Sequence, residues 1–293
     1  MEHMKKAMFL TAMVAALSGA RARAQDVETV EVPSAGVPIQ RTQRELVLPE
    51  GYVRGDLALA FGDNDGLDFS PQSGFFAHDL GGGLSIVPNL EFGVSLNREW
   101  FWPRVGGGLV PIYWDGDRAH FWRIPIYARY QFVTSEHVAI AADVEMNLAT
   151  HGYSNARRHA FRASLPVRLR FGSFMFDTGF TFEAETRGPA NHGQANIYFP
   201  AVFTLSATEA LFFRLATGIG ISDMRSRGVH MPLFFGGGYS LTISDVLADI
   251  NLDFGFPYLA HNDDFFVPGP GGDSTSPDIW MVKISFAAYL DLL

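Results

Sequence analysis

The chain contains no cysteine among its 293 residues. That absence excludes a disulfide framework and lipid attachment through an N-terminal cysteine. Charged side chains are also scarce at 18%, and the 22 basic residues are outnumbered by 31 acidic ones. The acidic excess excludes nucleic acid as an expected partner, because a phosphate backbone is bound by a basic surface.

Long apolar runs are absent beyond the first 24 residues. A membrane-spanning helix needs roughly 18 or more such residues, so an α-helical membrane protein is excluded. The first 24 residues are different: Lys5 and Lys6 precede an apolar stretch, and Ala22-Arg23-Ala24 then fits a signal-peptidase site. We expect residues 1–24 to be a signal peptide. Its removal leaves 18 of the 22 basic and 30 of the 31 acidic residues, a net charge of −12.

What the chain has in abundance is phenylalanine (26), glycine (30) and aromatic residues in general (14%), which favour strands and tight bends over helices. Apolar and polar residues alternate most clearly over 161–171, and again over 174–185 after the turn Gly172-Ser173. The same pattern predicts twelve strands, near 52–61, 75–87, 90–98, 120–132, 138–149, 160–171, 174–185, 195–206, 211–222, 229–243, 247–257 and 279–291.

Short and long polar connections alternate between these strands, and the strands have the length that a tilted strand needs to cross a membrane. The fold class is therefore all-β, a transmembrane antiparallel up-and-down barrel over residues 51–293 with both termini in the periplasm. Residues 25–50 contain Pro33, Pro38 and Pro49 and show neither helical nor strand period. We interpret them as a periplasmic N-terminal extension, with a small plug inside the barrel as the alternative.

The alternation and the aromatic residues near the expected strand ends resemble the Gram-negative outer-membrane β-barrel proteins. The strand count is similar to that of small outer-membrane channels and of outer-membrane phospholipase. The resemblance is architectural and covers about residues 51–293. It implies residence in the bacterial outer membrane, in contact with outer-membrane lipid and lipopolysaccharide, and it leaves room for envelope protein partners.

Charged residues occupy the polar face, and strands with basic residues neighbour strands with acidic ones. If Gly172-Ser173 is the turn, residues whose numbers sum to 345 face each other, which pairs Arg168 with Asp177 and Arg162 with Glu183. Arg54 and Asp56 extend the inward charge. The predicted lumen-lining set is Arg123, Arg129, Asp143, Glu145, Arg162, Arg168, Arg170, Asp177, Glu183, Glu185, Arg214, Asp249, Asp253 and Lys283.

Two interpretations of these charges are compatible with the pattern. In one, they pair across strands and fill a narrow lumen; in the other, they edge a water-filled path that selects solutes.

Candidates for chemistry are few. His151 and Ser154 in an expected external loop are similar to the His and Ser of outer-membrane phospholipase, but two residues separate them here instead of one. The run 63–68 supplies oxygen ligands of the kind that calcium prefers without the closing acidic residue at Gly74. We expect no enzyme activity, no metal and no cofactor.

Three functions remain in view. The leading hypothesis is an outer-membrane channel or transporter for small solutes with a charged, polar lumen. The second is a structural barrel subunit of an envelope-spanning machine for secretion, motility or export, with residues 25–49 as its periplasmic contact. The third is an outer-membrane lipid hydrolase that uses His151 and Ser154.

Overall fold

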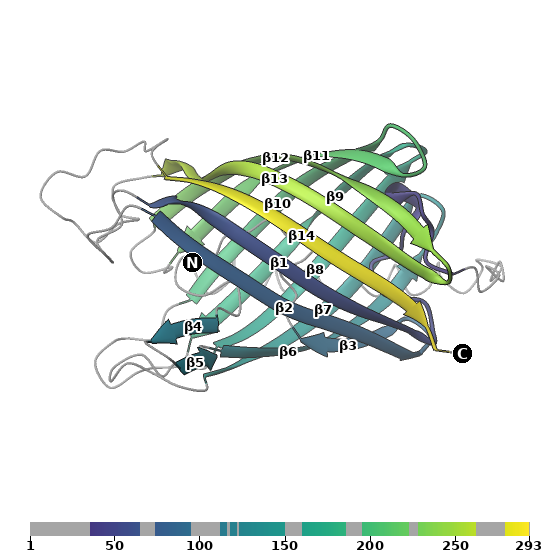
Figure 1. Cartoon of the computed structure of the whole chain (residues 1–293), viewed down its shortest axis with the longest axis horizontal. Coiled ribbons are helices and arrows are strands. Elements are labelled where there is room, and N and C mark those ends of the chain that lie inside the picture. The colour runs from purple at the N-terminus through teal and green to yellow at the C-terminus, as the bar shows by residue number, and fades with distance from the viewer. Residues whose placement is uncertain are drawn as a thin grey trace, which may run out of the picture. The chain divides into compact units, whose positions relative to one another are not determined.

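The computed structural model describes residues 36–64, 74–94, 112–115, 118–121, 123–149, 160–185, 195–222, 228–261 and 279–292. Within these ranges the chain is almost entirely strand (Figure 1). The elements are η1 (Arg41–Gln43), β1 (Tyr52–Asn64), β2 (Gly74–Val87), β3 (Leu90–Val94), β4 (Ile112–Asp115), β5 (Arg118–Phe121), β6 (Arg123–Thr134), β7 (Val138–Ala149), β8 (Ala160–Phe171), β9 (Phe174–Glu185), β10 (Ala195–Ser206), β11 (Leu211–Ser222), β12 (Gly228–Ile243), β13 (Val246–His261) and β14 (Ile279–Asp291).

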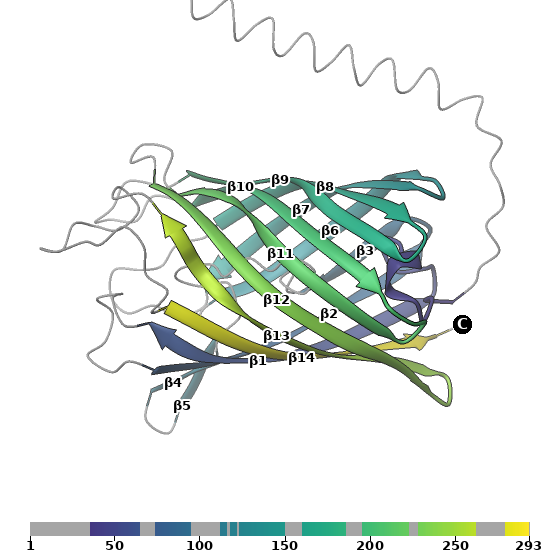
Figure 2. The same cartoon turned by 90° about the horizontal axis from the view of Figure 1, so that it is seen from above.

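Twelve of the strands close into one antiparallel barrel in the order β1-β14-β13-β12-β11-β10-β9-β8-β7-β6-β3-β2 (Figures 1 and 2). Each barrel strand pairs with its neighbour along the chain, and β1 pairs with β14 to close the ring, with Tyr52 opposite Asp291. The predicted fold class is confirmed. No helix in the described part of the chain is long and apolar enough to span a membrane.

The strand predictions agree with the structure to within a few residues for most of the barrel. The difference lies in the connection expected at 99–119 and the strand expected at 120–132. There, β4 and β5 form a separate two-stranded sheet, and the barrel strand β6 begins only at Arg123. We call the end of the barrel that carries the short turns, such as Gly172-Ser173, the short-turn end.

The two faces of the barrel wall differ in chemistry. Large apolar side chains point outward, and Phe171 is 59% exposed there. Outward rings from neighbouring strands contact each other, as Phe176 does Phe203 at 4.7 Å between ring centroids. Arg129 and Arg168, on the opposite face, are 1% and 2% exposed. An apolar exterior around a polar interior is the arrangement of a β-barrel that lies in lipid.

Prolines and glycines alternate along one line across five neighbouring strands, β8 to β12. Pro166 faces Gly179, and Pro200 faces Gly218. By continuation of the register, Gly179 also lies opposite Pro200 and Gly218 opposite Pro232, but the ladder pairs are interrupted at both places. Proline has no N–H to donate, and both glycines have positive φ, at 138° and 152°. The ladder is therefore weakened along this line.

Glycines inside strands create space for inward side chains. The glycine triplet at 236–238 lies inside β12. A Cβ on Gly236 would come within 1.8 Å of an Asp253 carboxylate oxygen. A Cβ on Gly83 in β2 would likewise meet Glu91 at 2.5 Å and the Tyr127 hydroxyl at 2.7 Å. These glycines make room for the buried ionic groups of the neighbouring strands.

Candidate functional site: the inward face of the barrel

The pairing that the turn Gly172-Ser173 predicts is confirmed in the register of β8 and β9. Arg168 faces Asp177, and its guanidinium donates to both carboxylate oxygens, at 2.7 and 2.9 Å. Arg162 faces Glu183 and donates to it at 3.3 Å. Each ion pair joins two neighbouring strands on the interior face, where a charge without a partner would be costly.

The same arrangement recurs around the ring. Arg129 on β6 donates to both oxygens of Asp143 on β7, at 2.7 and 3.0 Å. Arg162 also contacts Glu145 on β7 at 3.5 Å, so one guanidinium lies between two carboxylates. The remaining predicted groups follow on β11, β13 and β14: Arg214 pairs with Asp253 at 2.6 Å, Lys283 is the ladder partner of Asp253, and Asp249 is buried.

Two members of the predicted set stand apart. Arg123 lies at the start of β6, opposite Ala149, and Glu185 lies at the end of β9, opposite Ala160. Both positions are at the barrel end remote from the short turns. Both residues lie on strands that carry other members of the predicted set. That Arg123 and Glu185 line the lumen stays a prediction.

One buried ionic cluster, on β1, β3 and β6, was predicted from the sequence only in part. Arg54 donates to Glu91 at 2.7 Å, to the Tyr127 hydroxyl at 2.9 Å and to Asp56 at 2.8 Å. The Tyr127 hydroxyl in turn donates to Glu91 at 2.5 Å. Arg54 and Asp56 were expected to point inward. Glu91 could have been found by the same alternation, since its neighbour Phe92 is exposed on the outer face.

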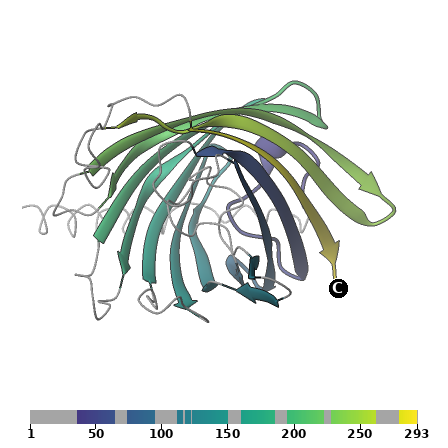
Figure 3. The same cartoon turned by 60° about the vertical axis from the view of Figure 1, so that its left-hand side comes forward.

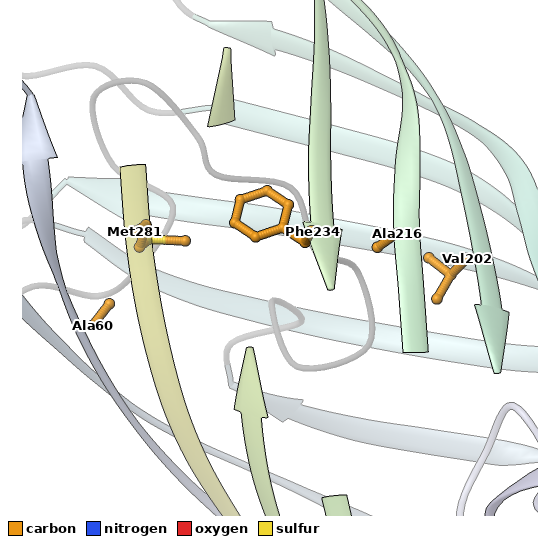
Figure 4. Packing of buried hydrophobic residues seen from close by; sticks show 5 residues of the cluster. All are labelled: Ala60, Val202, Ala216, Phe234 and Met281. Atoms are coloured by element: carbon orange, nitrogen blue, oxygen red, sulfur yellow. The ribbon is translucent and has the colours of Figure 1, made fainter. Parts of the chain in front are cut away.

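A second missed feature is an apolar band on the inner wall. Val202, Ala216 and Phe234 are successive ladder partners across β10, β11 and β12, and Met281 and Ala60 continue the cluster on β14 and β1 (Figure 4). Phe234 is 1% exposed and lies against Gly255, where a Cβ would come within 2.4 Å of its ring. The interior therefore carries an apolar band on strands that also hold inward charges, such as Arg214 on β11 and Lys283 on β14. The band could not be predicted from alternation of apolar and polar residues, because its strands carry apolar residues on both faces.

The segment that precedes β1 bonds to the barrel interior. Residues 36–49, which we call the strap, include η1 and are part of the same compact unit as the barrel. In Figure 3 this purple segment lies inside the ring of strands. Its hydrogen-bond partners lie on β3, β6, β8, β10, β12, β13 and β14: Glu91, Arg129, Gln131, Arg168, Arg170, Ser206, Ser240, Asp249 and Tyr289.

Arg44 is the most connected residue of the strap. Its guanidinium donates to both oxygens of Asp249 on β13, at 2.5 and 3.0 Å, and to Ser240 on β12 at 3.1 Å. It also lies 5.2 Å from the ring centroid of Tyr289 on β14. Charge-assisted, bidentate bonds of this kind are among the stronger polar interactions in proteins. One strap side chain thus joins three strands of the wall.

The predicted lumen-lining arginines also bind the strap. Arg129 uses its remaining amino group to donate to the Leu46 carbonyl at 2.8 Å. Arg168 does the same toward the carbonyls of Arg44 and Glu45, at 2.8 and 2.9 Å. Each arginine therefore faces an aspartate of the next strand on one side and the strap backbone on the other. The sequence indicated the first of these two roles and gave no sign of the second.

The other chemical candidates lie mostly outside the described ranges. This applies to His151, Ser154 and residues 65–68, whereas Asp63 and Asn64 end β1. Among the described residues no group of three or more His, Asp and Glu is placed to hold a metal ion.

No protein-family model matches the sequence, and no curated protein matches it. Solved structures do match. An outer-membrane channel from Pseudomonas putida F1 aligns over 83% of this chain and 97% of its own, with 9% identity and a TM-score of 0.54. OmpT of Vibrio cholerae aligns over 81% and 96%, with 8% identity and a TM-score of 0.42. A Pseudomonas aeruginosa FadL homologue aligns over 83% and 90%, with 10% identity and a TM-score of 0.40.

The chain has the fold of an outer-membrane β-barrel. That statement rests on the closed twelve-stranded ring and on the alignment with the Pseudomonas putida channel along nearly its whole length. At 9% identity the likeness establishes the fold alone. The chemistry of the interior must be argued from this chain's own residues.

Proposed function

We propose that this protein is a channel of the bacterial outer membrane that passes small hydrated solutes along its ionic inner wall. The observation that carries the proposal is the set of inward ion pairs, Arg129 with Asp143, Arg162 with Glu145 and Glu183, and Arg168 with Asp177. Replacing a buried ion pair by apolar residues of similar volume is often neutral or stabilising. Apolar side chains would therefore fill the barrel interior at least as stably as ion pairs do. Inward ion pairs are better suited to line a hydrated path.

The paired signs also bear on which solutes pass. Cationic and anionic side chains alternate from strand to strand across the ionic wall, so a solute meets both signs at nearly the same depth. Such a wall favours hydrated solutes that are small or that carry both signs, over solutes of one charge. At Arg162 two carboxylates face one guanidinium. We expect this position to give the path a weak preference for cations.

The test is conductance in planar lipid bilayers together with solute uptake by liposomes. Two forms are compared, the full chain and a variant that lacks the strap, because the strap lies inside one end of the barrel. At least one of them should conduct. Glu145→Gln combined with Glu183→Gln should shift the permeability ratio toward anions, with Glu209→Gln in the exposed turn as the matched control. Absence of conductance and uptake in both forms would contradict a channel.

The strap geometry bears on the structural-subunit hypothesis. That hypothesis assigns residues 25–49 to contact with a periplasmic partner. Residues 36–49 are bonded to the barrel wall in the structure, so their polar groups are engaged within the chain. A channel with an internal segment is therefore the better account of the described residues.

A further inference from the structure

We infer that the strap is an intramolecular plug which closes the short-turn end of the barrel and has to be displaced before solute can pass. This inference rests on the proposed channel function and assigns its regulation. It begins from topology: the strap's partners include strands on opposite sides of the closed ring, because β6 lies opposite β12 and β8 lies opposite β14. A single segment can reach all of these only by crossing the interior.

The crossing lies at one end of the barrel. Thr42 donates to the carbonyl of Gly172, in the turn between β8 and β9, at 3.0 Å. Glu45 accepts from Arg170, two residues before that turn, at 2.5 Å. The Leu48 N–H donates at 2.9 Å to Glu91, the second residue of β3. The strap therefore obstructs the short-turn end, and sequence analysis places that end in the periplasm.

The strap is held by side chains and makes no strand ladder with the wall. Its backbone groups at residues 44, 45, 46 and 48 bond to Arg168, Arg129, Gln131 and Glu91. Water can take over such bonds one at a time, so each bond contributes only a small part of the net free energy that holds the strap. Removing a ladder strand would instead break the ring. This mode of attachment suits a segment that detaches.

The wall also remains paired when the strap is gone. Arg129 keeps Asp143, and Arg168 keeps Asp177, because these pairs join neighbouring strands. Asp249 loses both Arg44 and Arg41 but still accepts from Ser240 at 2.8 Å and from Tyr289 at 3.2 Å. Each inward group named here keeps at least one hydrogen-bond partner, and the loss of two arginines by Asp249 is the main electrostatic cost of the open state.

A fixed pivot joins the strap to the barrel. Gly51 donates its N–H to Ser85 on β2 and accepts from Leu292 just after β14, at 2.8 and 2.9 Å. Its φ of 81° lies in the region that favours glycine, and Pro49 precedes it by two residues. The chain therefore turns sharply between the strap and β1. Residues 36–49 can leave as a unit while β1 stays in the ring.

The experiment uses the absence of native cysteine. Arg44→Met removes the link to Ser240 on β12 and the bidentate bond to Asp249 on β13, which leaves only the longer bond from Arg41 between the strap and Asp249, at 3.3 Å. Deletion of residues 36–49 removes the plug. The conductance of both variants should be at least tenfold higher than that of the full chain. Folding of each variant is verified by the heat-dependent mobility shift that folded barrels show on SDS gels. In the Arg44→Met background, Thr42→Cys with Ser206→Cys provides a lock, because the two hydroxyls are 3.3 Å apart. Oxidation should close this variant, and a thiol reductant should reopen it.

Ser164→Cys with Thr181→Cys in the same background is the matched control. Its hydroxyls are 3.0 Å apart, but the disulfide would join β8 to β9 within the wall. Its conductance should not change with redox state. The plug is contradicted if the deletion and the full chain conduct equally, or if oxidation of the lock leaves conductance unchanged. If no form conducts, the channel function falls and the plug falls with it.

Discussion

At the scale of single residues, the interior is a set of charges whose space is provided by glycine on the adjoining strand. Gly236 lies between Arg214 and Asp253 in the ladder, and Gly83 lies between Arg54 and Gly93. A side chain at either glycine would occupy the volume that the ion pair uses. A buried ion pair at these places therefore requires glycine at the facing position of the adjoining strand.

Gly236→Ala should destabilise the barrel by about 1–3 kcal/mol, because its Cβ would displace the Asp253 carboxylate from Arg214. Gly55→Ala in β1 is the matched control, since nothing lies within 4 Å of its Cβ position. It should change stability by less than about 0.5 kcal/mol. Urea unfolding in lipid vesicles measures both. Equal effects of the two substitutions would show that the space at Gly236 is not needed.

Most inward charges could be predicted from the sequence, because alternate residues of a strand lie on the same face. Arg168 and Asp177 even had their partners predicted, since a two-residue turn fixes the register. Arg44 could not be predicted. It lies outside any strand, and its partner Asp249 is 205 residues further along the chain.

At the scale of elements, the strands were predictable and the strap was not, for one physical reason. A strand buries alternate side chains against a regular neighbour, which imposes a period of two on its sequence. The strap is bound by groups from seven different strands, so no period is imposed on it. The pair β4 and β5 was not predicted, because it forms a separate sheet within the long polar connection between β3 and β6.

The line of prolines and glycines gives a prediction for the wall. Gly179→Ala should cost at least about 2 kcal/mol more than Gly172→Ala in the turn. Both glycines have positive φ, but Gly172 has open space around its Cβ position, whereas at Gly179 the Leu165 carbonyl oxygen is 2.2 Å away. Urea unfolding and folding yield into vesicles compare the two. A cost at Gly179 equal to that at Gly172 would mean that the local backbone relaxes freely.

At the scale of the whole molecule, successive residues of each barrel strand alternate between the lipid-facing surface and the interior. Leu165 is 36% exposed on the outer face, and its neighbour Ser164 is 9% exposed on the inner face. Single cysteines at these two positions can each carry a fluorescent label in an otherwise cysteine-free chain. Brominated lipid should quench the label at residue 165 strongly and the label at residue 164 weakly. Equal quenching would contradict the assignment of faces.

The proposed plug requires residues 36–49 to lie inside the barrel, bonded to its wall, and not in the periplasm. The most direct test is a spin-label distance in vesicles between Gln43 on the strap and Glu209 in the turn after β10, both of which are exposed. A strap bonded to the wall predicts one narrow distance distribution, which Arg44→Met should broaden. A broad distribution in the unmodified chain, unchanged by that substitution, would contradict the claim.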